Sequence, residues 1–158
     1  MDLIITSIAA GVMGTLVMDL FNFMFARAGV ITQIDIKMIG RMAAGWLRGH
    51  FRYADPSEIK KIPNETFVGF AAHYLIGICL ALPYIFGWDF LAGGSASPLW
   101  AIVYGIATTA GSFFLIYPSM GLGSFGKHSP EGIKAAVSSL ANHTYYGAGI
   151  ALWIVLTS

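Results

Sequence analysis

Four long apolar stretches limit what this sequence can fold into. They cover residues 3–25, 67–88, 99–118 and 140–157. In a helix, at about 1.5 Å per residue, each is long enough to cross a hydrocarbon layer of about 30 Å. They show no period-two alternation, and only a helix satisfies every backbone group in lipid without partner strands. The sequence therefore predicts an all-α integral membrane protein, one four-span domain over residues 1–158 that forms a four-helix bundle.

Composition and the first residues support this prediction. Hydrophobic residues make up 56% of the chain and charged residues 11%, whereas soluble domains carry about 25% charged residues. Asp2 precedes the first apolar stretch but no Lys or Arg does, so we interpret the stretch as a retained span and not as a secretory signal. The net charge of +1 gives no reason to expect a nucleic-acid partner, and the single cysteine, Cys79, excludes an internal disulfide.

The basic residues predict the orientation of the chain. All nine lie in the connection between the first two stretches or in that between the last two: Arg27, Lys37, Arg41, Arg48, Arg52, Lys60, Lys61, Lys127 and Lys134. Connections rich in Lys and Arg stay on the cytoplasmic side of the membrane. We therefore expect both termini and the turn at 88–98 to lie outside, with the lipid bilayer as the main partner.

The first connection carries a pattern of its own. Residues 34–51 place Lys37, Arg41 and Arg48 on one helical face and apolar side chains on most of the rest. This pattern favours an interfacial amphipathic helix on the inner leaflet, with the three cations near anionic headgroups. A cytoplasmic linker with solvated charges is the alternative.

A glycine-rich segment, GLGSFGKHS at 121–129, comes close to a nucleotide-binding loop. It departs from that motif at His128, where the motif needs a hydroxyl, and a predicted membrane helix precedes it instead of a strand. We therefore do not expect a bound nucleotide. We interpret the segment as a turn at the membrane surface with Lys127 and His128 facing the headgroups. Contact with an anion or a lipid phosphate is the alternative.

Two recurring spacings suggest a repeat of two parallel helical hairpins. The second and fourth stretches share His-x-x-x-Gly-x-x-x-Ala-Leu, starting at His73 and His143, and the first and third share Gly-x-x-x-Thr, starting at Gly11 and Gly105. Small residues four apart lie on one helix face and let two helices approach closely. If the second and fourth spans cross along these faces, the two histidines meet at similar depth. Chance is the alternative, because Gly and Ala are common in membrane helices.

Asp19, inside the first span, needs a partner, because an ionised group in the bilayer centre costs about 2.5–3.5 kcal/mol. We expect that partner to be His73 or His143. The candidate pocket comprises the polar residues predicted at one depth: Asp19, Asn22, His73, Ser112, Tyr117, His143 and Tyr146. Such a pocket either binds a proton, an ion or a small solute from the cytoplasm, or is a hydrogen-bonded knot that holds the helices in register. Asp19, His73 and His143 could also ligate a divalent metal, but they lack a local metal-binding spacing, so no metal is predicted.

Four segments together resemble one known family. They are GTLVMDL, AAHYLIGI, FFLIYPSMGLGSFGKHSP and SSLANHTYYGAGIAL, and the likeness extends over nearly the whole chain. The family is the group of bacterial inner-membrane proteins known as domain of unknown function 2938. The resemblance implies a multi-pass protein with four spans in the bacterial inner (plasma) membrane, and it implies no established activity.

Transport or sensing of a proton, ion or small solute at the cytoplasmic side is the function that these patterns favour. Four helices of this length pack without a wide channel, so we expect a homo-oligomer or a membrane-complex partner. One alternative is an accessory subunit that holds haem b or a metal between His73 and His143. Another is an enzyme that acts on lipid headgroups through Lys127 and His128, although no set of nucleophile, base and orienting group is recognisable. We therefore predict no cofactor, and an enzyme is the less favoured interpretation.

Overall fold

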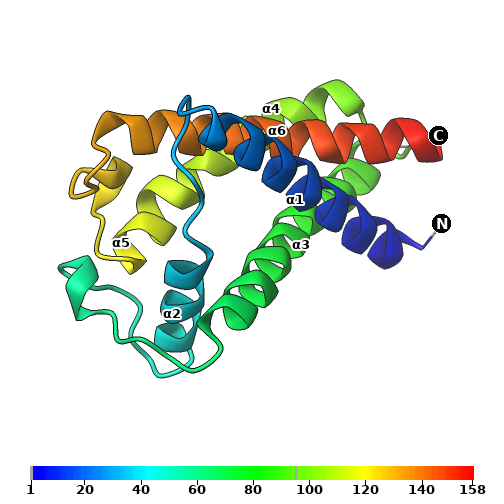
Figure 1. Cartoon of the computed structure of the whole chain (residues 1–158). Helices are drawn as coiled ribbons and strands as arrows, with labels where there is room; N and C mark the ends of the chain where they lie inside the picture. Colours follow the sequence, from blue (N-terminus) through cyan, green and yellow to red (C-terminus); the bar gives the residue numbers. More distant parts are fainter. Residues whose placement is uncertain (1, 95) are drawn as a thin grey trace.

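The computed structural model describes residues 2–94 and 96–158, and every regular element within them is helical (Figure 1). The long helices are α1 (Leu3–Arg27), α3 (Glu65–Ala92), α4 (Pro98–Gly111) and α6 (Ile133–Thr157). α4 continues through a π-helical turn, η2 (Ser112–Ile116), into the short α5 (Tyr117–Ser119). The connections contain α2 (Ile36–Trp46) and two 3-10 turns, η1 (Pro56–Glu58) and η3 (Ser124–Gly126). The predicted all-α class is confirmed.

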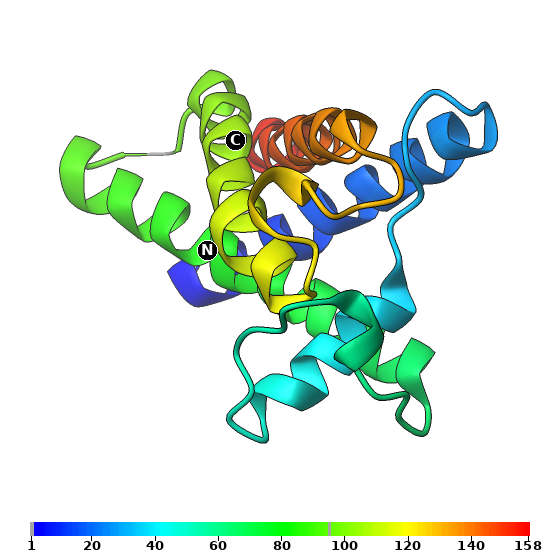
Figure 2. The same cartoon turned by 90° about the vertical axis from the view of Figure 1, so that its left-hand side faces the viewer.

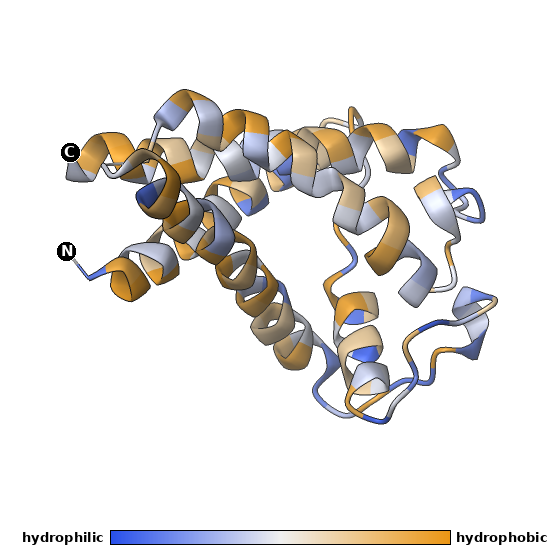
Figure 3. Ribbon diagram, turned by 180° about the vertical axis from the view of Figure 1, so that it is seen from behind, coloured by the Kyte–Doolittle hydropathy of each residue, from blue (hydrophilic) through white to orange (hydrophobic). Residues whose placement is uncertain are grey.

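Three helices are long and apolar enough to cross a membrane: α1, α3 and the continuous helix Pro98–Ser119. Large apolar side chains are exposed on all three, among them Leu16, Leu75 and Val103. Figure 3 shows apolar residues along the long helices and hydrophilic residues gathered in the connections around α2. Exposed apolar surface of this extent is unsuited to water and suited to acyl chains, so this is a membrane protein.

The long helices pack in the order α4, α6, α1, α3. α6 lies between α4 and α1, and α1 also packs on α3. Among the described residues, α3 and α4 make few contacts beyond the turn that joins them, and one of these is a hydrogen bond of 2.7 Å from Tyr104 Oη to Leu80 O in the middle of α3. Away from that turn the two helices diverge (Figure 1). They open toward the end of the molecule formed by residues 27–64 and 120–134, which carries every Lys and Arg and is called the basic end below.

The glycine stripes pack differently from the prediction. A Cβ atom on Gly11 of α1 would lie 2.6 Å from the Cα of Ile78 in α3, and one on Gly105 of α4 would lie 2.5 Å from the Cα of Gly147 in α6. Each stripe therefore contacts the other helix of its own hairpin, and the predicted crossing of the second and fourth spans is wrong. The physical reason is that a small-residue stripe fits any helix that presents a matching small face, and the matching faces here belong to α1 and α4.

α2 lies across the first turns of α3 at the basic end (Figure 2). It starts where the Asp35 side chain accepts a hydrogen bond from Met38 N at 2.9 Å, and a Cβ atom on Gly40 would collide with the backbone of Glu65. The helix is shorter than the predicted 34–51, because the chain turns at Gly49, whose φ is 81°. Its apolar face is covered by the protein, with these residues buried: Ile39, Gly40, Met42 and Gly45.

Candidate functional site

A cavity of about 800 Å³ lies in the opening between α3 and α4. α6 forms its back wall, α2 and the connections of the basic end form its floor and rim. Five predicted pocket residues line it: His73, Ser112, Tyr117, His143 and Tyr146. Two others, Asp19 and Asn22, lie outside the described lining. The cavity exists because α3 and α4 diverge, and it brings both membrane histidines to one space.

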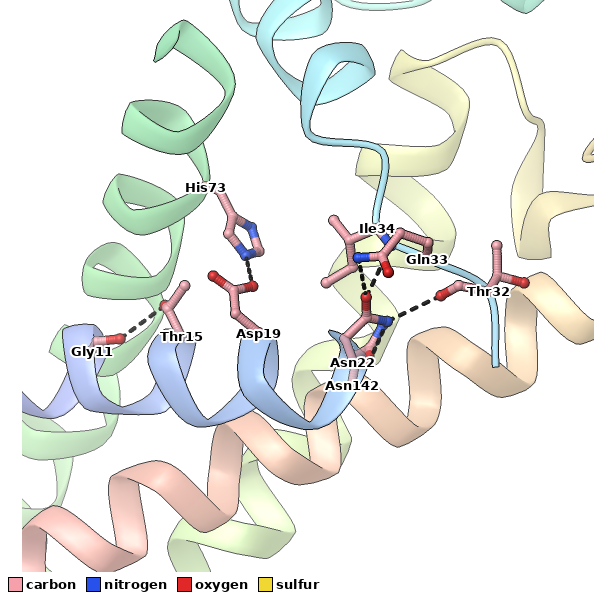
Figure 4. Close-up of polar contacts among 9 residues, drawn as sticks. All are labelled: Gly11, Thr15, Asp19, Asn22, Thr32, Gln33, Ile34, His73 and Asn142. Carbon is pink, nitrogen blue, oxygen red and sulfur yellow. Dashed lines mark hydrogen bonds and ion pairs between the residues drawn. The ribbon is translucent and has the colours of Figure 1, made fainter. Parts of the chain in front are cut away.

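Asp19 and His73 form a pair that joins α1 to α3 (Figure 4). His73 Nε2 lies 2.8 Å from Asp19 Oδ1, and the two side chains are 9% and 25% exposed. The carboxylate oxygen accepts from the ring N–H, so we assign the single proton of the neutral imidazole to Nε2, and in this form Nδ1 is an acceptor. No described residue hydrogen-bonds to Nδ1, and His73 lines the cavity. The pair therefore presents a hydrogen-bond acceptor to the cavity.

His143 is held on both ring nitrogens. Nδ1 lies 2.8 Å from Thr108 Oγ1 and Nε2 lies 2.9 Å from Ser112 Oγ. Thr108 already donates its hydroxyl proton to Gly105 O at 2.6 Å, so Nδ1 donates to Thr108, and Ser112 donates to Nε2. Of the two partners predicted for Asp19, the structure selects His73, because the imidazole of His143 faces Thr108 of α4 and Ser112 of η2. His143 ties α6 to α4 and η2.

The π-helical turn η2 occurs where this tie is made. Tyr117 N bonds to Ser112 O, five residues back, which gives the turn its width. Pro118 follows and has no N–H to continue a regular ladder, and Tyr117 Oη donates to Ala135 O of α6 at 2.8 Å. Single π-helical turns within α-helices are frequent at functional sites, because they redirect a side chain. Here the turn directs Ser112 to His143 and places Tyr117 in the cavity wall.

Asn22 belongs to a separate buried network (Figure 4). Its side chain is 1% exposed. The amide nitrogen donates to Thr32 O at 3.0 Å and to Asn142 Oδ1 at 3.1 Å, and the amide oxygen accepts from Gln33 Nε2 at 2.9 Å and Ile34 N at 3.1 Å. These four bonds use both donors and both acceptor sites of the amide. Asn22 thus holds the segment 32–34 against α1 and α6, and its geometry is that of a structural anchor.

The predicted surface cations lie at different places on the basic end. Arg41 makes a bidentate pair with Glu65, with Nε at 2.7 Å from Oε2 and Nη2 at 3.0 Å from Oε1, and these bonds raise the pKa of Arg41. Lys37, Arg48 and Lys127 are exposed. His128 is also exposed and lies on the rim of the cavity. Glycines with positive φ make residues 121–126 a tight turn, and the structure places a helix, not a strand, before it.

Several lining residues were missed at the level of sequence. Four of the seven methionines line the cavity: Met18, Met38, Met42 and Met120. The rim also carries three carboxylates, those of Asp35, Asp55 and Glu131, and Thr108 holds His143. The spacing of four between Thr108 and Ser112 is a signal that could have identified this pair, because it places both hydroxyls on one helix face. The methionines come from separate elements and give no such signal.

The candidate metal ligands do not converge. In residues 2–94 and 96–158 there is no group of three or more His, Cys, Asp and Glu side chains that could hold a metal ion. Asp19 pairs with His73, and both nitrogens of His143 are engaged by hydroxyls. Ligation of a metal or of haem iron by His143 would require breaking one of these hydrogen bonds.

Comparison with known proteins bears on the family alone. No curated protein and no solved structure is significantly similar to this chain. The model of one family, described as "Protein of unknown function (DUF2938)", matches residues 8–156. These residues include the four long helices almost entirely and every residue that lines the cavity. The chain therefore belongs to the DUF2938 family, as the resemblance of its segments implied.

Proposed function

We propose that this protein binds a small solute in the cavity between α3 and α4, from the cytoplasmic side of the bacterial inner membrane, in the service of transport or sensing. The cavity itself carries the proposal. Its volume of about 800 Å³ lies within the range of about 300–1,000 Å³ typical of small-molecule sites. It also has the usual character of such sites, a mainly apolar wall with a few placed polar groups.

The proposed orientation places the basic end in the cytoplasm and α6 across the membrane as the fourth span. The clustering of all Lys and Arg at one end supports the orientation. Both termini lie at the opposite end of the molecule (Figure 1), which is what an even number of spans requires. The polar side chains of α6, such as Asn142 and His143, face other helices or the cavity and so do not prevent α6 from spanning. A path across the membrane would still need a second copy or a partner, since four helices leave no wide channel.

The proposed hairpin repeat explains why the cavity forms at one helix interface. In this repeat α1 corresponds to α4, and α3 corresponds to α6. The contact between α1 and α6 therefore corresponds to the contact between α4 and α3. The first interface is closed through glycines: a Cβ atom on Gly149 would lie 2.7 Å from the Cα of Gly14. Along the repeat, Gly14 matches Thr108 and Gly149 matches Cys79. The close glycine-to-glycine approach of the first interface is therefore not available at the corresponding positions of α3 and α4, where the cavity lies.

The two other candidate functions have less support. A haem between the histidines would need nitrogens of His143 that are engaged by Thr108 and Ser112. For a headgroup enzyme built on Lys127 and His128, the side-chain hydrogen bond described for His128 is to a backbone carbonyl, Gly121 O at 3.4 Å, and joins it to no nucleophile.

Cysteine labelling tests whether the cavity is open to the cytoplasm. Gly111 lines the cavity, and a Cβ atom there meets no atom within 4 Å. In a Cys79→Ser background, Gly111→Cys should react with a membrane-impermeant maleimide in inside-out vesicles and stay unreacted in right-side-out vesicles. Gly87→Cys is the matched control, because Gly87 has equally open space but lies outside the described lining. It should not react in inside-out vesicles. Equal reactivity of the two variants, or labelling of Gly111→Cys from outside alone, would refute the proposal.

A further inference from the structure

The charges around the cavity have one sign. Three carboxylates line it, those of Asp35, Asp55 and Glu131, and no Lys or Arg of the described chain does, although all nine lie at the same end of the molecule. Arg41 is neutralised by Glu65, and Lys134, 3.9 Å from Glu131, offsets part of the charge of that carboxylate, so the negative charge of the lining comes mainly from Asp35 and Asp55. Hydrogen bonds from the Ser57 hydroxyl and N–H lower the pKa of Asp55, so this rim residue is ionised at neutral pH. A cleft lined by negative charge concentrates cations.

A buried polar group of the lining, the imidazole of His73, also offers an acceptor. His73 is 8% exposed, and Asp19 holds its proton on Nε2, away from the cavity. In Figure 4 the second ring nitrogen points away from Asp19, toward the segment that carries Ile34. Within the described chain no hydrogen bond is made to this nitrogen, and His73 lines the cavity, so Nδ1 is available to accept a hydrogen bond from a molecule there. A carboxylate behind the imidazole adds to its preference for a cationic donor.

The rest of the wall suits an apolar body of variable shape. Methionine side chains from α1, α2 and the 120–132 connection meet there with Ile76 and Leu80 of α3. Methionine is flexible and polarizable, and surfaces rich in it adapt to ligands of different outline. The methionine-rich wall can therefore accommodate apolar ligand bodies of different shapes.

We propose, on the basis of the binding role above, that the ligand is an amphipathic organic cation. Its ammonium group donates a hydrogen bond to Nδ1 of His73, and its apolar body lies on the methionine-rich wall. Asp19 does not touch the ligand and acts as a positioning residue that sets the proton on His73. An organic anion would be repelled by the carboxylates of the rim and by the lone pair of His73 Nδ1. A neutral alcohol could donate a hydrogen bond to His73, but the negative rim would not attract it.

Protection of Gly111→Cys from the maleimide tests the ligand class. Three probes share one body and differ in charge: 4-phenylbutylamine, 4-phenyl-1-butanol and 4-phenylbutyrate. The concentration of amine that halves the labelling rate in inside-out vesicles should be about tenfold or more below that of the alcohol, because a hydrogen bond with one charged partner exceeds a neutral one by about this much. The acid should protect least. Equal protection by amine and alcohol, or better protection by the acid, would overturn the proposal.

The variant Asp19→Asn tests whether the Asp19 carboxylate acts on ligand binding through His73 or only stabilises the fold. The amine should lose most of its advantage over the alcohol, because the carboxylate that strengthens His73 as an acceptor for a cationic donor is gone. If Asp19→Asn folds poorly, Asp55→Asn on the exposed rim serves instead and should reduce the advantage of the amine about two- to threefold. An unchanged ratio of amine to alcohol in a folded variant of either kind contradicts the assignment. If Gly111→Cys is labelled but the amine protects no better than the alcohol, the proposed ligand class is refuted and the cavity proposal stands. If Gly111→Cys is not labelled, the cavity proposal, on which the ligand class rests, is refuted.

Discussion

Replacement of Asn22 by leucine tests the division of the polar residues into an anchor and a binding site. Leucine is close to asparagine in volume and cannot form hydrogen bonds, so Asn22→Leu removes four bonds of 2.9–3.1 Å at a position that is 1% exposed. Buried hydrogen bonds average about 0.6 kcal/mol each in a membrane protein and about 1 kcal/mol in soluble proteins. The expected loss in free energy of unfolding is therefore about 2–4 kcal/mol.

Unfolding in mixed micelles with increasing SDS measures this loss. Gln33→Leu is the matched control, because it removes one of the four bonds at an exposed residue, and it should cost about 0.5 kcal/mol. The folded fraction of Asn22→Leu should still show labelling of Gly111→Cys, since Asn22 lies outside the described lining of the cavity. A change below about 0.5 kcal/mol for Asn22→Leu would show that the network does not anchor the segment 32–34.

Three further predictions concern packing, an ion pair and pH. Gly105→Ala should destabilise the protein by about 1–3 kcal/mol in the same unfolding assay, because the added Cβ would lie 2.5 Å from a Cα atom of α6. A double-mutant cycle of Arg41→Gln and Glu65→Gln should show a favourable coupling between the two residues, because the pair is bidentate; additive effects would contradict this. The lowered pKa of Asp55 means that its contribution to the local fold is present at neutral pH and is lost as the pH falls through the folded-state value. Ser57→Ala should therefore open the 52–59 segment to pepsin at a higher pH than in the parent, and identical pH profiles would be evidence against the hydrogen bonds.

Much of the fold could be predicted because it depends on local properties. The length and composition of each apolar stretch predict a helix, and the structure has helices over all four stretches. Boundaries were less accurate where a turn overrides the pattern, as at Gly49, which ends α2 early. Asp19 could be assigned a histidine partner from the cost of a lone charge in lipid. The sequence could not show which histidine Asp19 contacts, since His73 and His143 both begin the same His-x-x-x-Gly-x-x-x-Ala-Leu pattern.

The sequence alone determines that this chain is helical, belongs in a membrane and needs partners for its buried polar groups, because these properties follow from the solvent that each stretch can tolerate. Only the tertiary structure decides which small-residue faces meet, because several faces are nearly equivalent until the helices are placed together. Gly14 and Gly149 close the interface between α1 and α6, whereas α3 and α4 diverge and leave the cavity between them. The same tertiary contacts pair His73 with Asp19 and engage both ring nitrogens of His143.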